Sequence, residues 1–382
     1  MPLDTLELRI SVQKLLLALV VIIVPLSLVG LYITSESVSS QEAANGAHLS
    51  AIAQATSSAV SQYVDNFVTE VGSMALAPSV LEAATAAEHS YANMGEAAIG
   101  ERVDAEESKW NTTAADPAIK SILSSPAAGY LRAYREVDPR LLRIWVTDEA
   151  GAIVAATDKP EHFNQGKQEY WQAVYAQGRG SDYVSNVIWD ARNKANYVSI
   201  GMPIFDQASE KFLGVVNAWV NVSGLSSLLA NASLDRSTPI LLVKDNGTVI
   251  AGPNLGPLNQ TNSEEFGTVR EAMASASGRR NGHVIATTSN GKRLVGFADT
   301  GLRQSYSNLG WTVVVSMDER EATAPIRPVA RFAFFMVALS VLMLTLLAVY
   351  FVLHRRQQGP EIETPHAAQP PQPPPKAMSA SV

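Results

Sequence analysis

Two long apolar segments lie near the two ends of the chain. Residues 15–33 and residues 332–353 contain no charged side chain. A helix over the first segment would be about 28 Å long, close to the roughly 30 Å hydrocarbon core of a bilayer. Neither segment has the polar face of a surface helix, which argues against a buried core helix of a soluble domain. The pattern therefore predicts transmembrane helices over residues 15–34 and 329–353.

Basic residues next to the two segments predict their orientation. Arg9 and Lys14 precede the first segment, and the second is followed by His354, Arg355 and Arg356. Basic flanks stay on the cytoplasmic side of a membrane. We therefore expect a two-pass membrane protein, with residues 1–14 in the cytoplasm and residues 35–327 on the other side of the membrane. A cleaved signal peptide is the alternative for the first segment, but no A-x-A motif follows it directly.

Between the two segments, helical periodicity gives way to strands. Residues 41–77 place apolar side chains three and four positions apart, which predicts one long helix, and the Ala-rich residues 78–135 predict shorter helices. β-branched and aromatic runs then predict five strands and one helix. The strands are expected at 141–148, 151–158, 182–190, 196–206 and 212–222, and the helix at 168–178.

One phrase occurs twice in this middle region. VTDEAGAIVAATD at 146–158 and LVKDNGTVIAGP at 242–253 both read as an apolar strand, an Asp-to-Gly turn and a second apolar strand. Each is followed by a helical stretch and three more strands. The pattern predicts an α+β fold with two tandem modules, each an antiparallel five-stranded sheet with helical cover. We expect a membrane-distal module over 78–232 and a membrane-proximal module over 237–320.

Composition excludes several classes of function. The net charge is −7 and no Lys/Arg stripe is present, so nucleic acid is not an expected partner. Cysteine is absent, and the six histidines do not have the spacing of a metal site. Phosphate-loop and nucleophile-elbow motifs are also missing. We therefore expect no enzyme activity, no metal and no cofactor.

The order and spacing of these features resemble the double Cache family, the tandem PAS-like extracytoplasmic sensor domains of bacterial chemoreceptors and sensor kinases. The resemblance covers about residues 36–327. It rests on the long helix and on VTDEAGAIVAATD, EYWQAVYAQGRGSDYVSNVIWD, YVSIGMPIFDQASEKFLGVVNAWVNVSGL and LGWTVVVSMD. It implies a homodimer with paired long helices in a bacterial inner (plasma) membrane, with residues 35–327 in the periplasm or outside the cell. It also implies a small-molecule site in the distal module, on the sheet face that the long helix does not cover.

The resemblance also implies which residues form that site. The amino-acid-binding branch of the family uses a Tyr, an Arg-x-Trp-Tyr motif, a Tyr-x-Asp motif and a late Asp. These positions are held here by Phe163, Gln168, Tyr170, Trp171, Tyr183, Ser185 and Trp219. The aromatic positions keep their character, but every charged one is lost, so both charges of a free amino acid would be poorly met. We expect a different small organic ligand, a carboxylate or an aromatic heterocycle.

Two further residues complete the predicted site. Strand alternation places Arg143 and Trp145 on one face, with Ile144 and Val146 on the other. An Arg and a Trp there would suit an anionic or aromatic ligand, although a solvated Arg and a packed core Trp are the alternatives. Lys167, beside the lost Arg position, is a further candidate for anion binding, with a solvated surface Lys as its alternative. We include Trp145 and Lys167 in the predicted site.

The end of the chain bears on signalling. Residues 354–382 are proline-rich without an apolar core, which predicts a disordered cytoplasmic tail and no output domain. We therefore expect a membrane-anchored sensor that signals through a separate, unidentified partner protein. The alternative is a ligand-free scaffold that uses the same modules for protein interaction. An open, aromatic-lined cavity in the first module would favour the sensor, and a filled one the scaffold.

Overall fold

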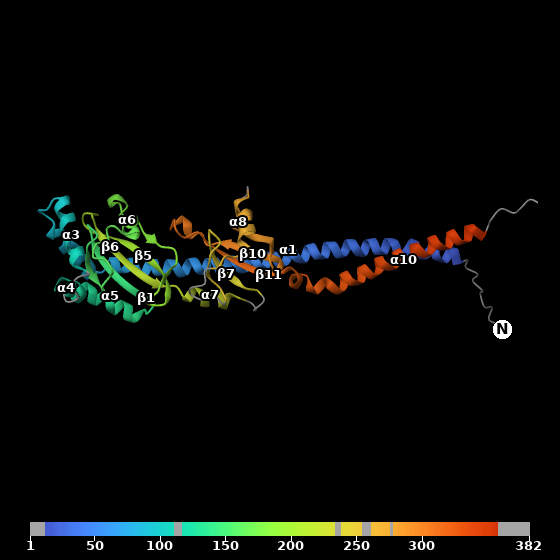
Figure 1. The fold of residues 1–382 in the computed structure, drawn as a ribbon, viewed down its shortest axis with the longest axis horizontal. Coiled ribbons are helices and arrows are strands. Elements are labelled where there is room, and N and C mark those ends of the chain that lie inside the picture. Colours follow the sequence, from blue (N-terminus) through green and yellow to red (C-terminus); the bar gives the residue numbers. More distant parts are fainter. Residues whose placement is uncertain (1–11, 111–116, 234–237, 254–260, 276–277, 358–382) are drawn as a thin grey trace, which may run out of the picture. The chain divides into compact units, whose positions relative to one another are not determined.

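The computed structural model describes residues 12–110, 117–233, 238–253, 261–275 and 278–357 (Figure 1). Most of the expected cytoplasmic N-terminus at 1–14 and of the expected tail at 354–382 lies outside these residues. The chain divides into two compact units. One contains residues 39–324, and the other is formed by the segments 1–38 and 325–382.

The terminal unit contains two apolar helical segments. Helix α1 (Val12–Ala75) begins here and continues into the other unit, and helix α10 (Arg327–Gln357) follows at the other end of the chain. The structure thus joins the helices expected at 15–34 and 41–77 into one. By length and composition, both helices could cross a membrane. In the terminal unit, most apolar side chains of these two helices are exposed, whereas Ser27 and Ser340 are buried with their Oγ atoms 2.5 Å apart.

The larger unit is built on two antiparallel sheets. The strand order of the first sheet is β2-β1-β6-β5-β3, with β4 also paired to β5, and that of the second is β8-β7-β11-β10-β9. The first sheet contains β1 (Leu141–Asp148), β2 (Ile153–Ala156), β3 (Tyr183–Val184), β4 (Ile188–Asp190), β5 (Ala195–Phe205) and β6 (Phe212–Asn221). The second contains β7 (Ile240–Lys244), β8 (Val249–Ala251), β9 (Asn281–Thr288), β10 (Gly291–Asp299) and β11 (Trp311–Asp318). In both sheets the first hairpin pairs with the last strand, which confirms the predicted α+β repeat.

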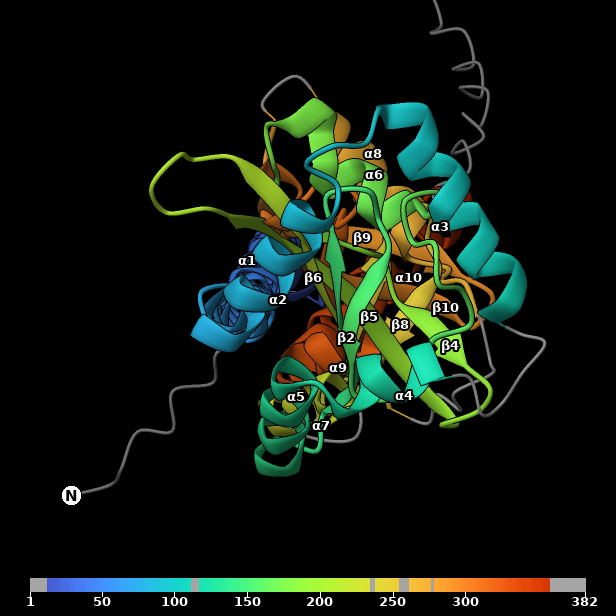
Figure 2. The same cartoon turned by 90° about the vertical axis from the view of Figure 1, so that its left-hand side faces the viewer.

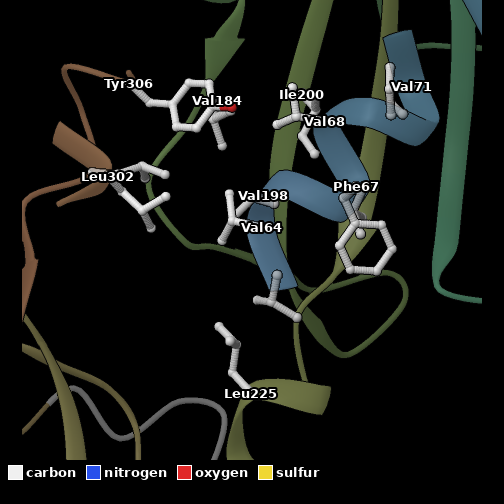
Figure 3. Packing of buried hydrophobic residues seen from close by; sticks show 14 of the residues in the cluster. Val64, Phe67, Val68, Val71, Val184, Val198, Ile200, Leu225, Leu302 and Tyr306 are labelled. Carbon is white, nitrogen blue, oxygen red and sulfur yellow. The ribbon is translucent and has the colours of Figure 1, made fainter. Parts of the chain in front are cut away.

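Helices cover the faces of these sheets. They are α2 (Pro78–Ser90), α3 (Glu96–Trp110), α4 (Pro117–Ser124), α5 (Pro126–Val137), α6 (Glu169–Tyr175), α7 (Gly224–Ala232), α8 (Phe266–Ala274) and the short α9 (Glu319–Ala322). Figure 2 shows β6, β2 and β5 between α1 and α2 on one side and α3 on the other. The α1 side chains that pack against Val198 and Ile200 of β5 are those of Val64, Phe67, Val68 and Val71 (Figure 3).

Alternation along the strands divides the first sheet into two faces. Ile144, Val146 and Ile200 point into the core that includes α1, α2 and α5. Trp145 and Val215 point to the opposite face, where α6 packs. The second sheet is divided in the same way. Its face toward α1 is approached so closely that a Cβ on Gly296 of β10 would lie 2.3 Å from the backbone carbon of Leu49.

The strand expected at 182–190 is wrong in one respect, since the structure breaks it into β3 and β4. The first sheet therefore has six strands rather than five. The break lies at Asn186, whose side chain makes two hydrogen bonds to the segment 308–311 of the second module. Its Nδ2 donates to the Asn308 carbonyl oxygen (3.1 Å), and its Oδ1 accepts from Trp311 Nε1 (3.0 Å). This segment thereby links the first sheet to β11 of the second.

Candidate ligand-binding pocket

A cavity of about 210 Å³ opens on the α6 face of the first sheet. Alternate residues of three neighbouring strands point into it, because side chains on one sheet face recur at every second position. Helix α6 and the segment before it line the side of the cavity opposite the sheet. Its lining comprises Arg143, Trp145, Pro160, Glu161, His162, Gln165, Gln168, Glu169, Tyr170, Tyr183, Ser185, Ile188, Tyr197, Ser199 and Trp219.

Flat aromatic rings form one wall of the pocket. The rings of Trp219 and Tyr197 stack with their centroids 4.2 Å apart and their planes at 23°. Trp145 meets Trp219 edge-on at 5.6 Å and Tyr170 at 6.0 Å. Such pairs stabilise each other beyond the area that they bury, so the wall is held in a fixed shape. A flat ligand would find a matching surface there.

A chain of hydrogen bonds holds the inner end of this wall. Trp145 Nε1 donates to the Tyr170 hydroxyl (2.8 Å), which donates to Gln165 Oε1 (2.9 Å). Gln165 Nε2 in turn donates to the His162 carbonyl oxygen (2.7 Å). Burial raises the pKa of Tyr170 far above its ordinary value, so the phenol stays protonated and remains a donor. These hydrogen bonds therefore hold the side chains of the pocket in place, and the Tyr170 hydroxyl keeps its proton at neutral pH.

Two further phenols of the lining are also neutral at physiological pH. Burial, reinforced by Glu169, raises the pKa of Tyr183 to about 12, and the Tyr183 hydroxyl lies 3.3 Å from Glu169 Oε1. Burial, reinforced by Asp190 and Glu161, raises the pKa of Tyr197 to about 12. The lining can therefore offer hydroxyl donors without adding negative charge.

Charge is unevenly placed in the pocket. Arg143 is only 9% exposed, and its guanidinium lies over the Trp219 ring, 5.3 Å from the centroid. The acidic residues of the lining, Glu161 and Glu169, are both exposed. The interior of the pocket is thus positive, and its rim is negative.

The structure brings six of the nine predicted site residues into this pocket. They are Trp145, Gln168, Tyr170, Tyr183, Ser185 and Trp219. Ser185 is held by β5, because its Oγ accepts from the Ser199 backbone N–H (2.8 Å).

The other three predicted residues lie elsewhere. Phe163 packs against Trp110 with their ring centroids 5.3 Å apart. Lys167 is exposed and pairs with Asp104 (2.9 Å). Trp171 donates from Nε1 to Thr147 Oγ1 (3.0 Å) and borders a different hollow, because successive residues of a helix point about 100° apart and Tyr170 already faces the pocket.

Several lining residues were not predicted. Tyr197 and Ser199 alternate with Val198 and Ile200, which point into the core, so the period-two pattern of this strand contained the necessary signal. Gln165 lies in the loop after the first hairpin, where no periodicity indicates a direction. Its place is set by the tertiary contact of its backbone N–H with the Gly151 carbonyl oxygen (2.7 Å).

The corresponding face of the second sheet is packed with side chains. Val243, Phe266, Phe297 and Val314 form an apolar cluster under α8. The buried carboxylate of Glu265 lies 3.4 Å from Arg293 Nε, and both side chains bond to Ser316. A hollow of about 350 Å³ borders this cluster, but the cation in its lining already has a carboxylate partner.

Comparison with known proteins identifies the fold. Residues 37–326 match the family model described as a Cache domain. No curated protein matches the chain. Similar solved structures include the ligand-binding domain of the Pseudomonas aeruginosa amino-acid chemoreceptor PctC in complex with GABA, at 14% identity and a TM-score of 0.44, covering 72% of this chain and 100% of that one.

Two other chemoreceptor ligand-binding domains are similar to a comparable degree. That of Campylobacter jejuni Tlp3 in complex with 4-methylisoleucine has 14% identity and a TM-score of 0.46, and the match covers 75% of this chain and 96% of that one. That of Pseudomonas fluorescens CtaA in complex with L-leucine has 13% identity and a TM-score of 0.42, and the match covers 72% and 96%. At such identities the likeness concerns the fold alone.

Proposed function

The chain belongs to the Cache domain family, and we propose that it is a membrane-anchored sensor whose first module binds a small organic molecule outside the cytoplasm. Cache domains are ligand-binding rather than catalytic modules. The observation that carries the proposal is the open, aromatic-lined pocket of about 210 Å³ in the first module. The same observation supports a sensor over a ligand-free scaffold, because a scaffold has no need of an open cavity beside a buried cation.

The proposed signal leaves the pocket through the segment between β3 and β4. Ser185 and Ile188 line the pocket, while Asn186 between them bonds to the second module. The next carbonyl oxygen, that of Val187, lies 3.5 Å from Lys244 Nζ. A ligand that displaces this segment would therefore act directly on β11, which leads along the chain through α9 into α10.

The membrane placement is part of the proposal. Helix α10 and the N-terminal part of α1 would cross the bilayer, both termini would be cytoplasmic, and copies would pair through α1. The exposed face of α1 includes Ala51, Ala55 and Ser58, small residues that allow close helix approach. A partner protein would read the resulting change in α10.

The absence of cysteine makes the proposed placement directly testable. Ala208→Cys lies in the exposed turn between β5 and β6, and Ser379→Cys lies near the end of the chain. In intact cells, a membrane-impermeant maleimide should label Ala208→Cys and leave Ser379→Cys unlabelled until the cells are lysed. Labelling of Ser379→Cys alone in intact cells would contradict the proposed orientation. Spontaneous cross-linking of Ala55→Cys would support the paired α1 helices.

Ligand binding can be tested by a thermal-shift screen of the full chain in nanodiscs against small carboxylates, heterocycles and amino acids. We expect at least one compound to raise the melting temperature of the wild type and to lose this effect in Trp219→Ala. A matched control is Trp189→Ala, which removes a tryptophan that does not line the pocket. If no compound acts, or if both variants respond like the wild type, the proposed sensor function is wrong.

A further inference from the structure

The pocket contains a buried cation whose charge has no internal partner. Among the described residues, Arg143 makes no ion pair or hydrogen bond through its guanidinium, which lies over the face of Trp219. A guanidinium carries five N–H donors. Burying such a group without acceptors is costly, so an arginine that is only 9% exposed normally has a carboxylate or carbonyl beside it. Here the donors remain available to a molecule that enters the pocket.

The acidic residues of the lining cannot replace that missing partner. Glu161 lies 3.5 Å from the Arg192 guanidinium, and the Glu169 carboxylate accepts a hydrogen bond from the Tyr183 hydroxyl. Both side chains are exposed at the rim. Apart from Arg143, the buried polar residues of the lining are Gln165, Ser185 and Ser199, and all three are uncharged.

The size and shape of the pocket restrict the rest of a ligand that carries an anionic group. A volume of about 210 Å³ corresponds to roughly seven water molecules at about 30 Å³ each, so only a small ligand fits. The Trp219 ring contacts the Arg143 guanidinium and stacks on Tyr197, so a flat group beside the cation would lie against aromatic surface.

We infer that the ligand is a small carboxylate with a flat apolar body and no α-ammonium group, and that Arg143 binds the carboxylate. The inference rests on the proposed function. A carboxylate matches the guanidinium fork with two parallel hydrogen bonds. An α-ammonium group would lie next to that carboxylate and therefore close to the Arg143 guanidinium, which also carries a positive charge. No acidic side chain is buried there to balance it. The cation also lies on β1, whereas the family's amino-acid motif, by resemblance, would place it at Gln168.

Three matched compounds test this inference on the full chain in nanodiscs by isothermal titration calorimetry. Phenylacetate has the proposed features, phenylacetamide is its neutral counterpart, and L-phenylglycine adds only the α-ammonium. We expect phenylacetate to bind at least tenfold more tightly than either of the other two, since charge-assisted hydrogen bonds to a carboxylate are about twice as strong as neutral ones. Equal or tighter binding of phenylacetamide or L-phenylglycine, or no binding of phenylacetate, would overturn the inference.

Two variants that each remove one positive charge test whether Arg143 is the residue that binds the carboxylate. Arg143→Gln should weaken phenylacetate binding about tenfold or more, whereas Lys167→Gln, which removes an exposed cation outside the pocket, should leave it unchanged. Unchanged binding to Arg143→Gln would refute the assignment. The wild-type comparison of phenylacetate with phenylacetamide does not depend on whether Arg143→Gln folds. If other compounds of the thermal-shift screen bind through Trp219 and phenylacetate does not, the ligand class is wrong and the sensor function stands.

Discussion

Replacing Asn186 with alanine should separate the two modules energetically. The side chain makes two hydrogen bonds to the second module, donating to Asn308 (3.1 Å) and accepting from Trp311 (3.0 Å). Each such bond stabilises a folded protein by about 1 kcal/mol net. Because Trp311 is fully buried, its indole N–H would also lose its acceptor, which adds about 1 kcal/mol. We therefore expect Asn186→Ala to lower the free energy of unfolding by about 2–3 kcal/mol.

The assay is chemical unfolding of the full chain in nanodiscs, followed by two probes. Tryptophan fluorescence reports mainly on the first module, because Trp311 is the one tryptophan of the second sheet. Circular dichroism reports on both modules. The wild-type transitions should coincide, as expected when two parts unfold together, and those of Asn186→Ala should separate. Asn193→Ala, in an exposed turn of the same sheet, should change the unfolding free energy by less than about 0.5 kcal/mol. An Asn186→Ala protein with wild-type stability and coincident transitions would refute the proposed link.

Three further predictions concern other parts of the chain. Tyr91→Phe removes the hydroxyl that donates to the buried Asp148 carboxylate (2.7 Å), and should cost about 1.5–3 kcal/mol at pH 7 as measured by urea unfolding. Burial holds the pKa of Asp148 above its ordinary value, and the hydrogen bond from Tyr91 lowers it. The loss of stability caused by Tyr91→Phe should therefore shrink as the pH falls through the folded pKa and the carboxyl takes up a proton. A loss that does not depend on pH would contradict this. The double variant Ser27→Cys/Ser340→Cys should form a disulfide on mild oxidation, seen as a mobility shift on non-reducing gels, because the two Oγ atoms are 2.5 Å apart; neither single variant should shift. Gly151→Ala should lower the melting temperature markedly, since Gly151 has φ +83° and its Cβ would lie 2.3 Å from backbone; a wild-type melting temperature would show that the turn adopts another conformation.

Much of the fold follows from local sequence pattern. The phrases around Asp148 and Asp245 each combine an apolar strand with a turn that needs glycine, so both hairpins could be predicted without tertiary information. The break between β3 and β4 could not. It depends on Asn186 finding Asn308 and Trp311 more than a hundred residues later, and no local propensity encodes such a partner.

The candidate site shows the same division. Alternation was enough to place Arg143 and Trp145 on the pocket face, and it would have placed Tyr197 there as well. Residues on loops and helices were harder to place. The sequence predicts Lys167 as an anion-binding residue. In the fold Lys167 instead pairs with Asp104 of α3, and no local sequence pattern indicates that these two residues meet.

Hydrogen–deuterium exchange of the full chain in nanodiscs, with and without the compound that gives the largest thermal shift, tests the central claim most directly. We predict slower exchange in β1, in α6 and across residues 183–188, with a smaller effect reaching residues 308–311 through Asn186. Protection confined to the second module, or no change along the first sheet, would contradict the claim that the first module holds the ligand.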